Sequence, residues 1–391
     1  MYLFLLGRDS KLSKLELIIY LQTFNFKYSV LLDSEKFLLI DFFQKNINFK
    51  KMINELGGIT RISKVFHKSE KIDSSFINYL DSDTPKKFNY SVSSIDVNEK
   101  QIDLTLAILK DYYKSIKAKA VYKKPRKFKN ERLTIVNPSN YLSWSLDQGF
   151  ELFIFFQDNK YNFAKTICAS SPKENRFKDV NRPLKKNLHS TSFRLARIMV
   201  NLLGLESNKT ILDPFCGTGT FLIEGLIRNY NVIGVDKNTE MSGFSENNLK
   251  WAQKYFNFKN SYKIINGDST KIKFKADGVV TEPFMGPFLN NLPNDFRARK
   301  ISSNLSLLYS NLFLNLNDNL KKGTRVIFIL PEFRTFDNKI VKVSENVFLN
   351  NNFKIYDITQ LDNNIKLFNP IFYDTPNGSK LNRYIYILEK K

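Results

Sequence analysis

Three acidic residues that each follow a short apolar segment are the first candidates for chemistry. Asp213 ends the segment TILD and precedes the glycine-containing turn PFCGTG. Asp236 ends the segment NVIGVD, and Asp268 follows the segment YKIING. Carboxylates accept hydrogen bonds from ammonium, hydroxyl and amino groups. The spacing from Asp213 to Asp236 is close to the roughly 20 residues at which an acid at the end of a second strand holds ribose hydroxyls. The pattern therefore predicts a nucleoside ligand.

The turn after Asp213 distinguishes between classes of nucleotide site. A phosphate-binding P-loop requires a lysine after its glycines, and a dinucleotide fingerprint requires a third glycine where Leu222 stands. Neither pattern is met. An acid in front of the glycines is better suited to the amino-acid part of S-adenosyl-L-methionine than to a pyrophosphate. The predicted cofactor-binding residues are Asp213, Pro214, Phe215, Gly217, Gly219, Asp236 and Asp268.

The segment GVVTEPFMGP carries the candidate reaction site. It is a strand that runs straight into a turn, and in a sheet of the expected order its end lies beside the cofactor. An exocyclic amine of a purine is a poor nucleophile, so its N–H groups need acceptors. Glu282 and the Pro283 carbonyl are predicted to accept them, and Phe284 is predicted to stack on the base. The alternative is a strand end stiffened by proline with no catalytic role.

The cysteines and histidines add little chemistry. Cys216 lies inside the cofactor turn, where a structural role is favoured over that of a thiolate nucleophile. His67 and His189 are the only histidines, so we expect no histidine-centred metal site. With Cys168 and Cys216 as the only cysteines, a disulfide framework is excluded, and a reducing cytoplasm is indicated.

The elements that must position these residues form an α/β pattern. Strand and helix signals alternate from about residue 191 to 330, which is typical of an open, mostly parallel, Rossmann-like sheet with helices on both faces. Residues 332–391 are expected to complete it. Residues 1–75 predict a first α/β domain and 76–170 a second, which includes a helix over about 98–117. Residues 171–190 show no convincing periodicity and are interpreted as a linker.

Length and composition set the outer bounds. A chain of 391 residues predicts two or three domains. No apolar run reaches the roughly 18 residues of a membrane helix, and the N-terminus reads as a strand and not a signal peptide, so we expect a cytoplasmic protein with no membrane partner. The net charge of +22 favours a polyanionic partner such as nucleic acid. The competing explanation is a lysine excess caused by an AT-rich genome.

A basic segment interleaved with aromatic residues is the candidate nucleic-acid contact. Ten Lys and Arg residues lie between Lys110 and Arg132, together with three tyrosines and a phenylalanine. Charge beside stacking surface is a common way to bind single-stranded or looped RNA, although a solvated helix end and loop would look similar. The predicted RNA-binding residues are Lys123, Lys124, Arg126, Lys127 and Lys129.

The motifs DPFCGTGTFLIEG, VIGVDKNTEMSGFSENNLKW and VTEPFMGP, with the opening YLFLLGRDSKLSKLEL, resemble the THUMP-containing tRNA guanosine-10 N2-methyltransferases of archaea and eukaryotes. The resemblance implies a class I methyltransferase domain over 191–391, an N-terminal domain over 1–75 and a THUMP-like RNA-binding domain over 76–170. It also implies tRNA as partner and, for the eukaryotic members, a small activating subunit. One motif departs from the family: the usual Asp-Pro-Pro-Tyr is replaced by Glu282-Pro283-Phe284-Met285.

The function predicted from these observations is transfer of a methyl group from S-adenosyl-L-methionine to the N2 amine of a guanosine in tRNA, at position 10. Two alternatives remain open. One is a DNA or rRNA amino-methyltransferase, since adenine N6 chemistry uses a similar arrangement of acceptors. The other is a catalytically silent RNA-binding subunit, which the altered motif at Glu282 makes plausible.

Overall fold

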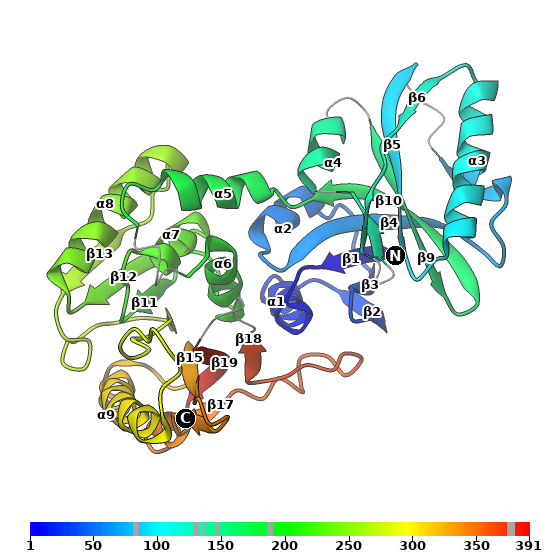
Figure 1. The fold of residues 1–391 in the computed structure, drawn as a ribbon. Coiled ribbons are helices and arrows are strands. Elements are labelled where there is room, and N and C mark those ends of the chain that lie inside the picture. The colour runs from blue at the N-terminus through cyan, green and yellow to red at the C-terminus, as the bar shows by residue number, and fades with distance from the viewer. Residues whose placement is uncertain (81–85, 129–132, 137, 146–148, 186–190, 374–379) are drawn as a thin grey trace. The chain divides into compact units, whose positions relative to one another are not determined.

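The computed structural model describes residues 1–80, 86–128, 133–136, 138–145, 149–185, 191–373 and 380–391 (Figure 1). Contacts within the chain divide it into two compact units. The first comprises Met1–Gly7, Lys27–Asn54 and Ile59–Glu174, and the second comprises Arg8–Phe26, Glu55–Gly58 and Asn175–Lys391. A helix near the N-terminus therefore belongs to the same unit as the C-terminal half of the chain.

The first unit is built on a mixed sheet with ten strands among the described residues. Their spatial order is β2-β3-β1-β4-β10-β9-β5-β8-β7, and β6 pairs with β5. β5 runs parallel to β6 and β9, and the other neighbours are antiparallel. The strands are β1 (Tyr2–Leu6), β2 (Tyr28–Asp33), β3 (Phe37–Phe42), β4 (Ile59–Ser69), β5 (Lys87–Ile95), β6 (Lys119–Tyr122), β7 (Arg126–Phe128), β8 (Leu133–Ile135), β9 (Phe150–Gln157) and β10 (Lys160–Ala169). One continuous sheet thus holds strands from both predicted N-terminal segments, and the boundary between them at residue 75 stays a prediction.

The helix predicted over about 98–117 is present as α3 (Glu99–Ser115). Its start is fixed by Asn98, whose side chain accepts a hydrogen bond from the backbone N–H of Gln101, an N-cap. Ile102 and Leu109 are buried against the sheet, whereas Leu106 and Ile108 are half-buried. The remaining helices of this unit are α2 (Phe49–Glu55), the 3-10 helix η1 (Ser74–Tyr79) and α4 (Pro138–Ser145).

The second unit contains the predicted open, mostly parallel sheet, and this part of the fold prediction is confirmed. The order is β13-β12-β11-β14-β15-β19-β17, with β16 on β15 and β18 on β19. The first five strands in that order are parallel, and β19 is antiparallel to β15. The strands are β11 (Thr210–Asp213), β12 (Asn231–Asp236), β13 (Tyr262–Asn266), β14 (Gly278–Thr281), β15 (Arg325–Arg334), β16 (Ile340–Lys342), β17 (Phe353–Ile355), β18 (Ile371–Tyr373) and β19 (Leu381–Lys390).

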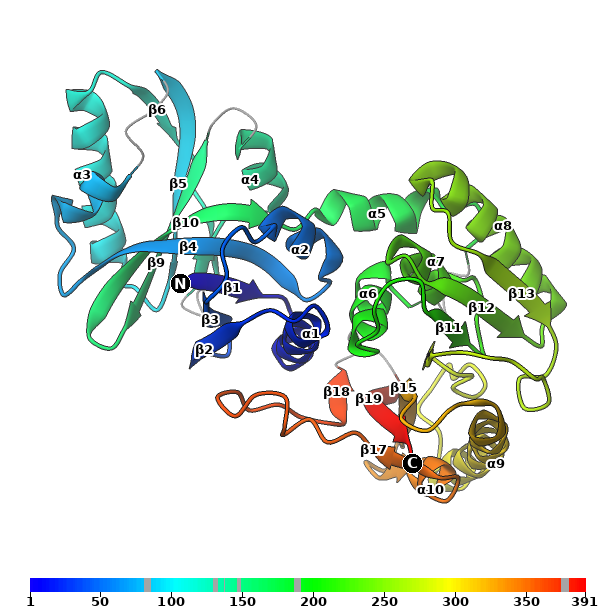
Figure 2. The same ribbon diagram turned by 180° about the vertical axis from the view of Figure 1, so that it is seen from behind.

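Helices cover both faces of this second sheet. Figure 1 and Figure 2 show α6, α7 and α8 on one face and α9 on the other. Since both faces are covered, the central strands read as nearly continuous apolar runs, which is why the sequence revealed them. The helices are α1 (Ser10–Thr23), α5 (Pro172–Asn181), α6 (Phe193–Leu202), α7 (Thr220–Ile227), α8 (Thr239–Phe256), α9 (Asp295–Asn319) and α10 (Asn346–Leu349).

Helix α1 is attached to α6 through a buried carboxylate. Glu16 accepts hydrogen bonds from the backbone N–H groups of Gly57 at 2.8 Å and Gly58 at 2.6 Å, and from the side-chain amide of Asn201 at 2.6 Å. Arg194, also on α6, forms an ion pair with Asp9 at 3.1 Å. These polar contacts hold α1 and α6 together within the second unit.

The segment 171–190, interpreted from the sequence as a linker without regular periodicity, contains helix α5. The helix escaped detection because it has no apolar stripe: Lys178 is its one fully buried residue. Proline at its first position favours a helix start. The predicted limits of the linker at residues 171 and 190 stay predictions.

The strand order reverses between β11 and β14, since β12 follows β11 on one side and β14 lies on the other. Open α/β sheets bind their ligands outside the carboxyl ends of the strands at such a reversal. Asp213 ends β11 and Thr281 ends β14. The fold therefore places the two predicted motifs side by side. None of the helices in the described ranges is long and apolar enough to cross a membrane.

Candidate active site

The turn between β11 and α7 is shaped by two glycines with left-handed backbone angles. Gly217 has φ +52° and Gly219, the N-cap of α7, has φ +82°. A Cβ at Gly217 would meet only the Phe215 carbonyl oxygen, 4.0 Å away, whereas one at Gly219 would lie 2.7 Å from the Oγ of Ser245 on α8. Gly219 thus allows α8 to approach. Gly217 leaves open space over the turn, as close approach of a ligand requires.

Asp213 is buried at the centre of this turn with only half of its carboxylate satisfied. Oδ1 accepts hydrogen bonds from the Thr281 hydroxyl at 2.7 Å and from the Phe215 N–H at 3.1 Å. Oδ2 is buried and has no hydrogen-bond partner among the described residues. Burial raises the pKa of Asp213 to about 7, and Asp236 and Glu282 add to this effect. A buried acceptor without a partner is costly, so this oxygen marks where a cationic donor would bind.

The other two predicted acids lie at the ends of the neighbouring strands. Asp236, at the end of β12, accepts hydrogen bonds from the N–H groups of Gly217 and Asn238, both at 2.9 Å. Asp268, two residues beyond β13, accepts from the backbone N–H and hydroxyl of Thr270. Those hydrogen bonds keep the pKa of Asp268 below its ordinary value. Asp213, Asp236 and Asp268 thus lie along one edge of the sheet.

The reaction motif follows β14 directly. Glu282 forms an ion pair with Arg383 of β19, whose Nε lies 2.7 Å from Oε1, and its Oε2 accepts a hydrogen bond from the hydroxyl of Thr191. Pro283 is buried, whereas the ring of Phe284 is exposed and its carbonyl accepts a hydrogen bond from Tyr309 at 2.7 Å. Through the bond from Thr281 to Asp213, the motif and the cofactor turn form one constellation.

Sequence reasoning missed the residues that hold Glu282 in place. Arg383 is 101 residues away and Thr191 is 91 residues away along the chain. Arg383 was visible only as part of an apolar C-terminal strand, and Thr191 only as a residue before a helix. The contact of Arg383 depends on the pairing of β19 with β15, and the contact of Thr191 depends on where the chain before α6 lies, and neither has a local signal in the sequence.

A second group of buried charges holds α7, the helix that follows the turn, against α5 and α6. Glu224 on α7 bonds to Lys178 of α5 and, at 3.0 Å, to Arg197 of α6. Burial alone would raise the pKa of Glu224, but Arg197 and Lys178 together lower it. Arg182 donates to the hydroxyl of Thr220 at 2.9 Å. The predicted linker region therefore fixes the helix that begins the cofactor turn.

Cys216 and the histidine that the structure describes show no arrangement for catalysis. Cys216 is buried, and burial raises the pKa of its thiol well above the ordinary value, which opposes thiolate chemistry. His67 bonds to Ser75 at 3.0 Å and stacks on Tyr79, whereas His189 lies outside the described residues. Within the described ranges, no group of three or more His, Cys, Asp or Glu residues is arranged to hold a metal ion.

The predicted RNA-binding residues lie in the first unit around β6 and β7. Lys124 and Arg126 are exposed, and Lys123 is half-buried with its N–H donating to the Tyr90 carbonyl at 2.7 Å. The side chain of Lys127 and the whole of Lys129 lie outside the described residues. Lys124 and Arg126 therefore lie at the surface of the first unit, and their role in RNA binding stays a prediction.

Comparisons with known proteins identify the family. A model described as DNA methylase matches residues 9–246, and one described as RMKL-like, methyltransferase domain, matches residues 183–358. A "Probable tRNA (guanine(10)-N2)-dimethyltransferase" of Methanothermococcus thermolithotrophicus is 30% identical over 158 residues, 39% of this chain and 88% of that protein. A "tRNA (guanine(10)-N2)-dimethyltransferase" of Methanothermobacter thermautotrophicus is 29% identical over 153 residues, which is 39% of this chain but 41% of that protein.

The fold comparison covers the whole chain. The crystal structure of TrmN from Thermus thermophilus is similar with a TM-score of 0.54 at 11% identity, over 100% of this chain and 99% of that one. The predicted fold class, a Rossmann-like methyltransferase domain preceded by α/β structure, is thereby confirmed. The match to the Methanothermobacter thermautotrophicus protein spans less than half of that protein's length. The chain belongs to the methylase family that the broader model describes and to the tRNA (guanine(10)-N2)-dimethyltransferase family.

Proposed function

We propose that this protein transfers methyl groups from S-adenosyl-L-methionine to the exocyclic N2 amine of a guanosine in tRNA, at position 10. The observation that carries the proposal is the joining of two motifs in one constellation. The half-satisfied Asp213 is bonded to Thr281, and Thr281 is followed directly by Glu282. The names of the two archaeal relatives support the choice of base and position.

The residues present fit the cofactor. The unpartnered Oδ2 of Asp213 is suited to the ammonium group, and Gly217 leaves room for close approach of the amino-acid part. Pro214 and Phe215 complete the turn. Asp236 would hold the ribose hydroxyls and Asp268 the adenine amine, from the ends of the next two strands. When bound, S-adenosyl-L-methionine supplies an electrophilic methyl group.

Glu282 is the residue proposed to receive the target amine. A carboxylate offers about four lone-pair sites, so the bonds from Arg383 and Thr191 leave capacity for N–H donors of a base. Accepting those hydrogen bonds would return electron density to the nitrogen, and the Pro283 carbonyl would be a second acceptor. Phe284, with its exposed ring, is suited to stacking on the base. Holding the amine in one orientation removes entropy from the encounter of two substrates.

The ion pair with Arg383 addresses the departure from the family motif. Glu282 has one methylene more than the usual aspartate, and an unrestrained side chain of that length would sample several rotamers. Arg383 and Thr191 each bind a different carboxylate oxygen, which restricts the side chain from both sides. The longer residue is therefore suited to act as a fixed acceptor.

The basic N-terminal half would bind the tRNA. Lys124 and Arg126 present charge beside β6 and β7, in line with the net charge of +22. Contacts of this kind go to phosphates and position a nucleic acid without reading its sequence. The target base must leave its stack to reach the carboxylate, at a cost of about a few kcal/mol. We place the enzyme in the cytoplasm, in agreement with its two free cysteines.

A second candidate is a DNA amino-methyltransferase, which is favoured by the match of the DNA methylase model to residues 9–246. The exocyclic N6 of adenine poses the same chemical problem as the N2 of guanine. The two candidates differ in the nucleic acid that is bound and in the product that forms.

The test is to incubate the purified protein with S-adenosyl-L-methionine and an unmodified tRNA transcript, then to digest the RNA to nucleosides for mass spectrometry. We expect N2-methylguanosine or its dimethyl form, lost in Glu282→Gln and retained in the control Glu206→Ala, which removes an exposed carboxylate. Methyladenine in duplex DNA, with unmodified tRNA, would assign the second candidate. If calorimetry detected no binding of S-adenosyl-L-methionine, the chain would be a silent RNA-binding subunit.

A further inference from the structure

Four phenylalanine rings lie exposed on the segments beside the reaction motif. Exposed fractions are 54% for Phe284, 56% for Phe288, 78% for Phe296 and 66% for Phe336. Single exposed apolar side chains are ordinary, but a group of them at one place marks a binding surface. All four belong to the second unit, and Phe284 is the residue next to Pro283 in the motif.

Buried side chains and hydrogen bonds hold the backbone that carries these rings. Leu289 and Pro293 turn inward and are buried, so the loop is anchored between its exposed rings. The Tyr309 hydroxyl of α9 fixes the Phe284 carbonyl at 2.7 Å, and the Phe336 N–H donates to the Pro293 carbonyl at 3.1 Å. The connection from β15 to β16 therefore contacts the end of the loop that precedes Phe296, and Phe284 lies at the other end of the same loop, beside Tyr309 of α9.

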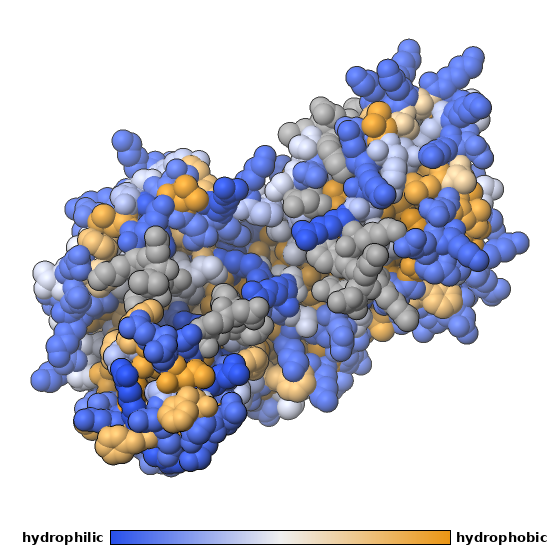
Figure 3. All heavy atoms as spheres, in the orientation of Figure 1, coloured by the Kyte–Doolittle hydropathy of each residue, from blue (hydrophilic) through white to orange (hydrophobic). Residues whose placement is uncertain are grey.

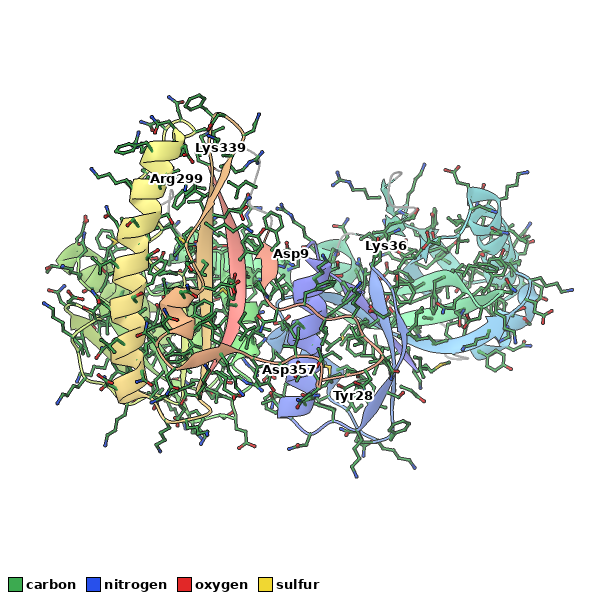
Figure 4. The ribbon with its side chains drawn as sticks, turned by 90° about the horizontal axis from the view of Figure 1, so that it is seen from below. Asp9, Tyr28, Lys36, Arg299, Lys339 and Asp357 are labelled. Atoms are coloured by element: carbon green, nitrogen blue, oxygen red, sulfur yellow. The ribbon has the colours of Figure 1, made fainter. Side chains whose placement is uncertain are left out.

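Positive charge surrounds the rings. Residues 284–300 and 334–340 contain five cations, Arg297, Arg299, Lys300, Arg334 and Lys339, against the two carboxylates Asp295 and Asp337. All five cations are exposed. Figure 4 shows Arg299 near the start of α9 and Lys339 beside it at the same end of the unit. In Figure 3 the surface over α9, at the lower left, carries orange side chains between blue ones.

We propose that this aromatic platform, defined by Phe284, Phe288, Phe296 and Phe336 with the surrounding cations, binds unpaired nucleotides that flank the target base. The inference rests on the proposed function, because it assumes that RNA is the substrate. Successive bases stack on aromatic rings whatever their sequence, and the cations track the phosphates. When the target base leaves its stack, the bases on either side lose a stacking partner, and aromatic rings can replace it.

Charge favours nucleic acid over another protein surface as the occupant. Arg299 pairs with Asp295 and Lys339 pairs with Asp337, and five cations against two carboxylates leave a net charge of +3. An apolar protein partner would cover the rings but would desolvate this net charge without compensation. A polynucleotide satisfies both at once, since each nucleotide carries one flat apolar face and one negative charge. The position of Phe284, directly after Pro283, places the platform where the strand enters the site.

The test compares RNA binding by Phe296→Ala/Phe336→Ala with that of the wild type. These two rings are the most exposed of the four, so their loss should not affect folding. The control is Leu307→Ala/Leu314→Ala, which removes two comparably exposed side chains further along α9. Fluorescence anisotropy with a labelled single-stranded RNA and with the tRNA transcript gives the affinities. Stacking on one ring is typically worth a factor of about 5 or more, so we expect a loss of about tenfold or more.

Four further measurements separate stacking from other roles. The KM for tRNA should rise with the loss of affinity, while calorimetry should give unchanged binding of S-adenosyl-L-methionine. The variant Phe296→Trp/Phe336→Trp should bind RNA as the wild type does, because tryptophan keeps a flat ring. The variant Phe296→Leu/Phe336→Leu keeps an apolar side chain without that ring and should bind as weakly as the alanine variant.

Several outcomes would overturn the proposal. RNA affinity equal to wild type in the alanine or the leucine variant would show that no base stacks there. A dimer of the wild type that dissociates in the alanine variant, with RNA affinity unchanged, would assign the surface to a second copy of the chain. Failure of the proposed function is a separate result: a wild type that binds RNA without forming methylguanosine would refute the methyl transfer and leave the anisotropy comparison valid.

Discussion

The half-satisfied carboxylate of Asp213 makes the stability of the free protein depend on pH in a direction opposite to that of most carboxylates. Burial raises its pKa from the ordinary value of 3.8 to about 7. Between these values the folded state keeps a proton that the unfolded chain has released, so stability falls as pH rises. The stabilisation that comes from this retained proton is complete below about pH 4 and is lost by about pH 8. From pH 5 to pH 8 the free energy of unfolding therefore falls by roughly 2–3 kcal/mol because of Asp213.

The perturbation that tests this is Asp213→Asn. An asparagine keeps an oxygen to accept from Thr281 and Phe215 but does not titrate, so the loss of stability between pH 5 and pH 8 should be smaller by roughly 2–3 kcal/mol. Urea unfolding at pH 5, 6, 7 and 8 without cofactor gives both profiles. The comparison uses the slope with pH because the amide itself adds a cost that does not vary with pH.

A control and a refuting result complete the design. Asp357 is exposed, and hydrogen bonds from Thr359 lower its pKa, so Asp357→Asn should leave the profile between pH 5 and pH 8 unchanged. Parallel profiles for the wild type and Asp213→Asn would refute the reasoning, because they would mean that Asp213 is ionised throughout this range. The raised pKa of Asp213 would then be wrong, whereas an ionised carboxylate would still suit the ammonium group of the cofactor.

Four other substitutions probe the same unit. Gly217→Ala should lower the free energy of unfolding by about 1–2 kcal/mol because of the positive φ, and it should weaken binding of S-adenosyl-L-methionine in calorimetry. Gly219→Ala should lower the free energy of unfolding more, as measured in urea, because its Cβ would also contact α8. Glu224→Gln leaves two buried cations without their carboxylate and should lower the free energy of unfolding by about 3–5 kcal/mol; a loss below about 1 kcal/mol would contradict this. Arg383→Gln should lower kcat on tRNA by about tenfold or more with little change in cofactor affinity, since it releases Glu282; an equal loss of cofactor affinity would indicate damage to the fold instead.

The cofactor half of the site could be predicted from sequence because its signals are local. The strands that end at Asp213 and Asp236 are apolar runs bounded by glycine and asparagine turns, and the order of such strands in an open α/β sheet is restricted. The position of Thr281 at the end of β14 followed from the same rule. The hydrogen bond from Thr281 to Asp213 is a consequence of that order, although its existence needed coordinates.

The contacts that complete the site could not be predicted, because they join distant parts of the chain. Arg383 reaches Glu282 only because β19 is antiparallel to β15, and a one-residue shift of register would turn its side chain to the other face. Helix α5 was hidden because Lys178, which is charged, is its one buried residue. Glu16, on the N-terminal helix, bonds to Asn201, 185 residues away.

Two kinds of feature that ordinarily cost stability occur together at the cofactor turn. A buried carboxylate with one unpartnered oxygen at Asp213 and two left-handed glycines lie within seven residues of one another. Such features persist where function requires them and where the surroundings hold them in place. Here the surroundings are well satisfied: Glu224, on the helix that begins at the turn, binds two cations from α5 and α6. An acceptor for an ammonium group must stay unpaired until that group binds, and this lowers the stability of the free protein. Neighbours such as Glu224 and its two cations, which are not proposed to contact the ligand, offset that loss.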